Sequence, residues 1–295
     1  MNIAVIGTVY VDIKGYPLGN FEPKGRNVGD VLQFHGGVGR NIAEDVASFG
    51  ENVSFVSLVD RTGIGIDVKG RLERRNIHTK FVRATDDGMG TWMAIFDKEG
   101  ELCANISKRP NLLPIRDILV EHGDEIFTWA DSVLLELDME EEIAAEVFRL
   151  AQKHNVPVYI VISNIELAMK RMEYVRQAVC FICNRLEAQT LFGEKVDNPE
   201  AMLILMQKKK DALGIRNLVV TMDADGAAYL DENGNAGICP AKKVKVVDTT
   251  GAGDAFFSGT AVGLTRGETL EEACRMGTEA ASQVIGKEEN VYINE

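Results

Sequence analysis

The sequence lacks any apolar run long enough to cross a membrane, and it shows no basic segment or cleavage site of a signal peptide. Its opening residues, Met1–Gly7, have the pattern of a strand. Positive charge is also scarce, because 32 Lys and Arg stand against 45 Asp and Glu and leave a formal net charge of −13. Such a surface repels phosphate backbones and anionic lipids, so we expect a cytoplasmic protein whose partners include neither nucleic acid nor a membrane.

Cysteine is sparse, and its pattern does not support a zinc site. The five cysteines are odd in number and scattered along the chain. Cys180 and Cys183 form a C-x-x-C pair, but they lie in an apolar run where a strand would turn them to opposite faces. No second pair or nearby His completes a metal site. We therefore expect buried, reduced thiols.

The sequence does contain enough apolar material, 45% of its residues, for one large α/β core. Short apolar runs alternate with amphipathic helical patterns, which is typical of parallel βαβ units. Runs this apolar suit strands covered on both faces, so we predict a doubly wound, mainly parallel α/β sheet. The predicted strands lie at 3–6, 53–58, 132–137, 156–162, 179–183 and 218–222, and the predicted helices at 40–49, 64–75, 140–153, 198–213, 252–264 and 270–285.

Two stretches depart from this alternation. Residues 9–35 hold turn glycines around short strand-like pieces. Residues 77–107 contain a hairpin pattern, with a turn at Asp97–Gly100 between two apolar segments. Because both stretches leave the sheet near its N-terminal half, we expect them to pair into a small β-sheet lid. There are no repeats or linkers, so residues 1–295 should form a single domain that carries this lid.

The segment from Val247 to Gly259 concentrates the chemistry. A strand should end at Val247, and a helix should begin near Ala252, where free N–H groups and the helix dipole favour an anion. Gly251 and Gly253 let a phosphate approach the backbone, and Asp254 places a carboxylate beside it. A base beside a phosphate cradle is what phosphoryl transfer to an alcohol needs. The alternative is that Asp254 only favours the dipole and the glycines only permit tight packing.

Residues 248–255 closely resemble the D-T-x-G-A-G-D signature of the ribokinase (PfkB) family. Two further family motifs occur in the expected order: G-G-x-G-x-N at Gly36–Asn41 and N-x-x-E at Asn184–Glu187. The resemblance covers essentially the whole chain, including the lid. It implies a ribokinase-like fold and an ATP- and Mg²⁺-dependent kinase that transfers the γ-phosphoryl group to a primary hydroxyl of a sugar or nucleoside.

The resemblance also implies roles for individual residues. Asp254 would be the general base, with an anion hole formed by Gly251, Ala252 and Gly253. The residues expected to bind the hydroxyls of the acceptor are Asp12, Gly37, Gly39, Asn41 and Asp138. The residues expected on the nucleotide side are Asn184, Thr221, Asp223 and Gly226, with Glu187 organising Mg²⁺ through water. Taken singly, Asp12 reads as a turn residue, Asp138 as the start of a helix and Glu187 as an exposed charge.

One residue and two short segments depart from the commoner family pattern. Asp223 stands where Gly is usual, so the nucleotide there needs Mg²⁺ or an outward-facing carboxylate. The segment 161–164 lacks an Asp that often follows that strand. The run Val284–Asn290 lacks the basic, small-residue ending that helps to form a monovalent-cation site, which argues against potassium activation.

The acceptor is predicted from short local similarities. The start Val11–Tyr16, the glycine loop with Arg40, and Asn184–Ala188 look most like the pseudouridine-kinase branch, so pseudouridine is the expected substrate. The alternative is a sugar or sugar-phosphate kinase of the ribokinase, fructokinase or phosphofructokinase type, in which Arg40 and Arg109 clamp a phosphate. The plainer interpretation leaves both arginines at the surface.

Two further classes remain as competitors. A catalytically silent sugar or nucleoside sensor would need a damaged base or anion hole, and both are intact. A Rossmann dehydrogenase would need G-x-G-x-x-G after the first strand, where the sequence reads Gly7-Thr8-Val9. The predicted lid should close over the acceptor and exclude water. Its exposed strand face is a candidate docking surface for a second subunit, which would give a homodimer.

Overall fold

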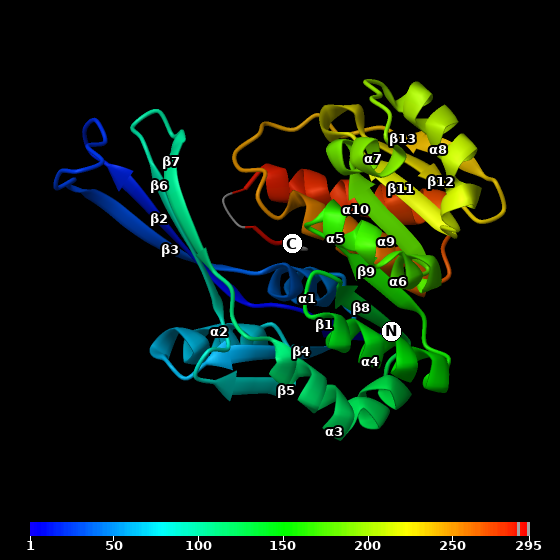
Figure 1. The fold of residues 1–295 in the computed structure, drawn as a ribbon, viewed down its shortest axis with the longest axis horizontal. Coiled ribbons are helices and arrows are strands. Elements are labelled where there is room, and N and C mark those ends of the chain that lie inside the picture. The colour runs from blue at the N-terminus through cyan, green and yellow to red at the C-terminus, as the bar shows by residue number, and fades with distance from the viewer. Residues whose placement is uncertain (288–289, 294–295) are drawn as a thin grey trace.

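The computed structural model describes residues 1–287 and 290–293. Two sheets of different size organise the chain (Figure 1). Nine strands form the large sheet in the order β13-β12-β11-β10-β9-β8-β1-β4-β5, and four strands form the small sheet in the order β3-β2-β6-β7. The prediction of a mainly parallel α/β sheet with a separate small sheet is confirmed.

The large sheet is parallel except at one edge. Its strands β1, β4, β5, β8, β9, β10 and β11 pair in parallel with one another, while β12 pairs antiparallel with β11 and β13 antiparallel with β12. The central strands are buried along most of their length, as expected for strands covered on both faces. Their bounds are β1 Asn2–Ile6, β4 Asn52–Asp60, β5 His78–Thr85, β8 Ser132–Glu136, β9 Val158–Val161, β10 Cys180–Asn184, β11 Asn217–Thr221, β12 Ala227–Leu230 and β13 Ala236–Cys239.

Helices cover both faces of this sheet and build a separate apolar core on each (Figure 1). Alternate residues of β1 enter different cores, Ala4 on one side and Val5 on the other. One core takes side chains from α1 (Val38–Ser48), α2 (Gly63–Arg74), α9 (Ala252–Thr265) and α10 (Leu270–Ile285). The other takes side chains from α3 (Leu113–Trp129), α4 (Glu141–His154), α5 (Ile165–Lys170), α6 (Met172–Gln177), α7 (Arg185–Phe192) and α8 (Pro199–Leu213).

Cys180 and Cys183 follow the same alternation. Cys180 lies in the first of these cores and Cys183 in the second, and both are buried free thiols. The expectation of cysteines on opposite faces of a strand therefore agrees with the structure. The expectation of burial holds for Cys239 and Cys274 as well, but it is wrong for Cys103, which is exposed.

The small sheet forms the lid, and it extends away from the large sheet as an arm (Figure 1). It consists of β2 (Tyr10–Pro17), β3 (Gly29–Gly36), β6 (Gly90–Phe96) and β7 (Leu102–Lys108). The second lid segment begins at Gly90 rather than at residue 77, because residues 78–85 form β5 and pair with β4 in the large sheet.

The lid joins the body beside the carboxyl end of β1, since β2 follows that strand and β3 leads directly into α1. Ligands of open α/β sheets bind outside the carboxyl ends of the strands. The fold therefore places the predicted motifs where a ligand site is expected. None of the described helices is both long and apolar enough to span a membrane.

Candidate active site

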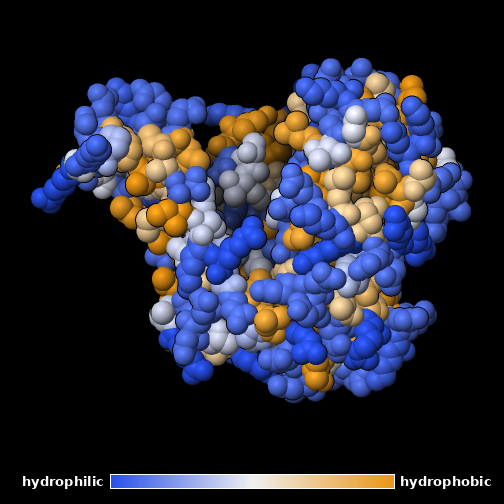
Figure 2. All heavy atoms as spheres, in the orientation of Figure 1, coloured by the Kyte–Doolittle hydropathy of each residue, from blue (hydrophilic) through white to orange (hydrophobic). Residues whose placement is uncertain are grey.

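A cavity of about 650 Å³ lies between the lid and the carboxyl edge of the large sheet. The surface is hollowed between the lid arm and the body (Figure 2). The wall is built from the segment after β1, the lid strands β2 and β6, and the residues that follow β8, with the first turns of α1 and α9. The predicted site residues that line it are Asp12, Gly37, Asn41, Asp138, Gly251 and Asp254.

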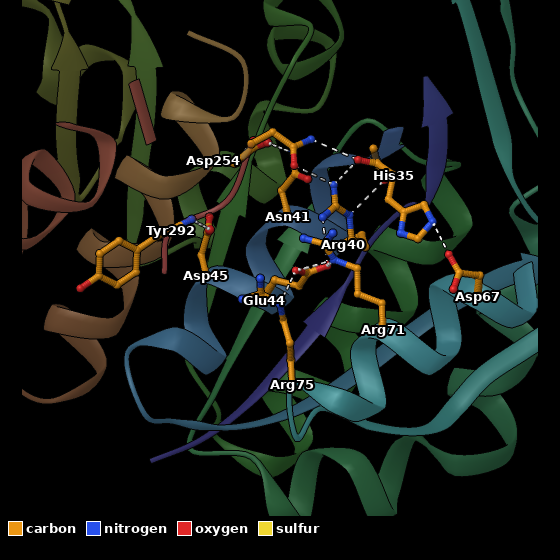
Figure 3. Close-up of polar contacts among 12 residues, drawn as sticks. His35, Arg40, Asn41, Glu44, Asp45, Asp67, Arg71, Arg75, Asp254 and Tyr292 are labelled. Carbon is orange, nitrogen blue, oxygen red and sulfur yellow. Dashed lines mark hydrogen bonds and ion pairs between the residues drawn. The ribbon is translucent and has the colours of Figure 1, made fainter. Parts of the chain in front are cut away.

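Asp254 and Asn41 meet across this cavity although 213 positions separate them. Asn41 Nδ2, in the first turn of α1, donates to Asp254 Oδ2 at 2.7 Å (Figure 3). Burial raises the pKa of Asp254 to about 6, while the Asn41 hydrogen bond and the charge of Arg40 lower it. A carboxylate that changes protonation state near neutral pH suits a general base.

The predicted anion hole forms the beginning of α9. Gly251 is the N-cap with φ +82°, and a Cβ there would lie 2.1 Å from the carbonyl oxygen of Asn290. At Gly253 a Cβ would meet nothing within 4 Å, so the first turn is open on that side. The Ala252 N–H donates to the carbonyl oxygen of Thr249 at 3.2 Å, so of the three predicted anion-hole groups those of Gly251 and Gly253, beside Asp254, are the ones left to meet an anion.

Gly37 and Gly39, at the start of α1, have different structural roles. Gly37 adopts φ +98° and lines the cavity. Gly39 does not line it, because a Cβ on Gly39 would lie 2.5 Å from the carbonyl carbon of Gly7. Gly39 thus lets α1 pack directly on the end of β1, a packing role that differs from the predicted substrate contact.

Sequence reasoning missed Glu136, which is buried at the end of β8 and lines the cavity. Thr8 donates to Glu136 Oε2 through its backbone N–H at 2.8 Å and through its hydroxyl at 2.9 Å. The pKa of Glu136 is raised to about 7, chiefly by burial and also by the charges of Asp138 and Asp254, against the lowering effect of the Thr8 hydrogen bonds. A charged residue within an apolar strand pattern was the available signal.

Asp12 and Asp138 supply two more carboxyl groups to the cavity. Burial raises the pKa of Asp12 against the opposing charges of Lys14 and Arg40. Asp138 Oδ2 accepts a hydrogen bond from the backbone N–H of Ser163 at 2.6 Å. Acceptors gathered around one cavity favour a ligand that is rich in hydroxyl or N–H donors.

Arg40 is fully buried, so it neither lies at the surface nor faces the cavity as a phosphate clamp. Its Nη1 donates to Glu44 Oε1 at 2.9 Å, and its Nη2 contacts the carbonyl oxygen of His35 and Asn290 Oδ1 (Figure 3). Glu44 pairs with Arg71 and Arg75 as well. The guanidinium therefore ties α1 to the root of the lid. Arg109, in contrast, is exposed and lines the cavity.

The predicted nucleotide residues lie apart from this cavity, along the neighbouring strands of the same sheet edge. Thr221 ends β11, and Gly226 has φ +89° shortly after it. Asp223 has φ +51°, a conformation that favours glycine, which accounts for the usual family residue there. None of the predicted nucleotide residues lines the cavity that holds Asp254.

Asn184 and Glu187 form a capping box at the start of α7. Asn184 Oδ1 accepts from the Glu187 backbone N–H at 2.9 Å, and Glu187 Oε2 accepts from the Asn184 backbone N–H at 2.8 Å. Burial raises the pKa of Glu187, and the charge of Asp138 adds to the rise. Over the described ranges no cluster of three or more His, Cys, Asp or Glu could hold a metal. This donor set fits Mg²⁺ held mainly by phosphates and water, with Glu187 in its outer shell.

Comparisons with known proteins identify the family of the chain. Residues 1–294 match the family described as pfkB family carbohydrate kinase. The chain is 34% identical over 295 residues to guanosine-inosine kinase of Exiguobacterium acetylicum, covering 99% of this chain and 97% of that protein. It is 26% identical over 288 residues to pseudouridine kinase of Escherichia coli (strain K12), covering 97% and 91%.

A solved structure supports the fold independently. Arabidopsis thaliana ribokinase complexed with ribose and ATP superposes with a TM-score of 0.83 at 21% identity, over 99% of this chain and 96% of that chain. The large sheet with its separate lid is therefore ribokinase-like. The chain belongs to the pfkB family of carbohydrate kinases, and it is a phosphotransferase that uses a hydroxyl group as acceptor.

Proposed function

We propose that this protein is an ATP-dependent nucleoside kinase that phosphorylates the primary hydroxyl of a purine ribonucleoside, guanosine or inosine. The observation that carries the chemistry is the position of Asp254, whose carboxylate lies in the first turn of α9 and is held by Asn41. A base and an anion-binding helix start share one cavity wall. The 34% identical guanosine-inosine kinase supports the choice of acceptor.

The residues of the cavity divide the work between orientation and proton transfer. Asp12, Gly37 and Asn41 would bind the ribose hydroxyls and direct the primary hydroxyl toward Asp254. Asp254 takes the proton of that hydroxyl as its oxygen bonds to the γ-phosphorus of ATP, while the bond from that phosphorus to the β,γ-bridging oxygen breaks and ADP leaves. The N–H groups of Gly251 and Gly253 stabilise charge on the transferred phosphoryl group. Closure of the lid excludes water that would otherwise accept the phosphoryl group.

The nucleotide is expected along β10 and β11. Asn184 and Thr221 end these adjacent strands, and Gly226 and Asp223 follow at the turn. Kinases of this family use ATP and Mg²⁺, and the ion neutralises phosphate charge when it is bound. Glu187 would orient water around it. Potassium activation is not part of the proposal, and Glu288 and Glu289 of the segment concerned lie outside the described residues.

Pseudouridine is the second candidate acceptor. The 26% identical pseudouridine kinase and the local similarity around Arg40 favour it. A sugar-phosphate acceptor is disfavoured because the Arg40 guanidinium already donates to Glu44 and to the carbonyl oxygen of His35 at the root of the lid.

A cytoplasmic location, where ATP is available, remains a prediction. We also propose that the protein dimerises through the outer face of the lid.

The test is Mg²⁺- and ATP-dependent ADP release with guanosine, inosine, pseudouridine, uridine, ribose, fructose and fructose 6-phosphate as acceptors. We expect the two purine nucleosides to give the highest kcat/KM.

Asp254→Asn should lower kcat by about 10³-fold or more and leave nucleoside binding within a few-fold, because the amide keeps the shape but cannot take a proton. Normal turnover by this variant would show that another group is the base.

A further inference from the structure

We propose that Glu140 recognises the base of the nucleoside by accepting a hydrogen bond from an N–H group on its edge. This inference rests on the proposed nucleoside kinase function and adds a specificity-determining residue to it. Glu140 lines the cavity and precedes α4, four residues after Glu136.

The turn that carries Glu140 is rigidly held. Arg171 is buried, and its Nη1 donates to the carbonyl oxygens of Leu137 and Met139, the second at 2.6 Å. One guanidinium nitrogen therefore fixes the backbone on both sides of Asp138. Preorganised acceptors of this kind are the mark of a binding site, because their orientation is set before the ligand arrives.

Both carboxylates of this turn use one oxygen for the protein and leave the other unpaired. Asp138 Oδ2 accepts from Ser163 N at 2.6 Å, and Glu140 Oε1 accepts from Leu112 N at 3.2 Å. Within the described part of the chain, Asp138 Oδ1 and Glu140 Oε2 are buried and have no hydrogen-bond partner. Buried acceptors without a donor are destabilising, so this pair points to a ligand that supplies two donors.

Glu136 and Glu140 contact different parts of the cavity wall, so Glu136 lies toward the catalytic end and Glu140 toward the end expected to hold the base. Glu136 contacts Thr8 at the end of β1, on the side where its pKa responds to Asp254. Glu140 instead contacts Leu112, which follows the lid strand β7. A nucleoside with its primary hydroxyl at Asp254 and its ribose beside Asp12 and Asp138 would extend its base toward Glu140.

The surroundings of Glu140 suit a flat heterocycle. Apolar groups of the wall of the same cavity come from Pro110, Leu112, Met139 and Leu167, and Trp92 of β6 lines it as well. Trp92 pairs in register with Asp12, so both side chains lie on the same face of the lid. An apolar bed with one carboxylate acceptor selects a base with an N–H edge, such as guanine or hypoxanthine.

The experiment compares inosine, which has N1–H, with purine riboside, which lacks it. We expect the wild type to favour inosine by about tenfold or more in kcat/KM. Glu140→Gln keeps an oxygen for Leu112 N–H but turns an NH₂ donor toward the base. It should lower kcat/KM for inosine by about 10- to 100-fold and for purine riboside by no more than about threefold. Glu141→Gln, the neighbouring exposed position, is the control and should change neither.

Each outcome decides the proposal. Equal use of inosine and purine riboside by the wild type would overturn it, and this comparison needs no variant to fold. Equal losses for both substrates in Glu140→Gln, with an unchanged thermal unfolding temperature, would also overturn it. Failure of the wild type to phosphorylate any nucleoside would instead refute the proposed function itself. A preference for inosine that disappears only in Glu140→Gln supports the assignment.

Discussion

At the scale of single residues, the Asn41–Asp254 hydrogen bond links the glycine loop of α1 to the start of α9. It is a contact between two motifs that the sequence places far apart. The buried Oδ1 of Asn41 has no partner among the described residues, so the same amide is free to accept from an acceptor hydroxyl. Asn41 is therefore positioned to hold the base and the substrate together.

The pH dependence of activity should follow Asp254. Its pKa is raised to about 6, so the carboxyl group is protonated and inactive below that pH and ionised above it. We expect kcat/KM for the acceptor to rise with pH through about 6 and then level off. Asn41→Ala removes a donor that lowers the pKa, so the rising limb should move up by about 0.5–1 pH unit.

Asn164→Ala provides a matched control for this profile. Asn164 also lines the cavity, but its side chain accepts from the backbone N–H of Leu167 instead of contacting Asp254. The rising limb of the pH profile of Asn164→Ala should stay at the wild-type position. A wild-type rate that is flat between pH 5 and 7, or an Asn41→Ala limb that does not move, would contradict the assignment of Asp254 as the titrating base.

At the scale of elements, the junction of β1 and α1 depends on Gly39. A Cβ at this position would lie 2.5–2.6 Å from the backbone of Gly7 and Thr8, which cannot yield as a flexible side chain would. We expect Gly39→Ala to lower the free energy of unfolding by about 1–3 kcal/mol, as overpacking does. Urea denaturation followed by circular dichroism measures this change.

Gly63→Ala is the control, because a Cβ at the start of α2 would meet nothing within 4 Å. It should leave stability unchanged or raise it by about 0.4–1 kcal/mol. If Gly39→Ala were as stable as Gly63→Ala and lost only affinity for the acceptor, Gly39 would be a substrate contact instead of a packing residue.

The elements also show how far sequence patterns reach. Long apolar runs and amphipathic helices predicted most of the central sheet and its main helices to within a few residues. The pattern did not predict α3, where Gly123 weakens the helical signal; a Cβ there would lie 2.4 Å from Leu150 of α4. It also missed β12 and β13, which are only four residues each.

The part of the candidate site that is formed by local sequence motifs could be predicted from the sequence. The residues of the glycine loop and of the start of α9 do meet at one cavity. Glu136 and Arg171 were missed because their partners are distant: Glu136 binds Thr8 across 128 positions, and Arg171 binds Leu137 across 34. Tertiary contacts of this kind leave no periodic signal. Arg40 was misjudged for a different reason: His35, Gly36 and Glu44 are within five residues of it, but their spacing does not show that the chain folds over them and buries the group.

At the scale of the whole molecule, the lid presents two unlike faces. Asp12, Trp92 and Ser107 lie in one row across three strands and line the cavity. The next row, Ile13, Met93 and Ile106, points to the opposite face because side chains alternate along a strand. Apolar side chains gather on the lid arm (Figure 2). Ile13 packs partly against the core of the body, whereas Met93 and Ile106 are exposed, so the outer end of this row marks a candidate interface.

A second copy of the lid would cover this row by packing sheet on sheet, so we expect the protein to sediment as a dimer. Ile106 is 73% exposed in the single chain, and Ile106→Asp would place a charge in the dimer interface. The variant should weaken dimerisation by about 100-fold, the loss typical of a central interface residue, and sediment as a monomer at micromolar concentration. Ile204→Asp, which changes an equally exposed isoleucine on α8, should remain dimeric. A monomeric wild type, or an Ile106→Asp variant as dimeric as Ile204→Asp, would show that the outer face of the lid does not join two subunits.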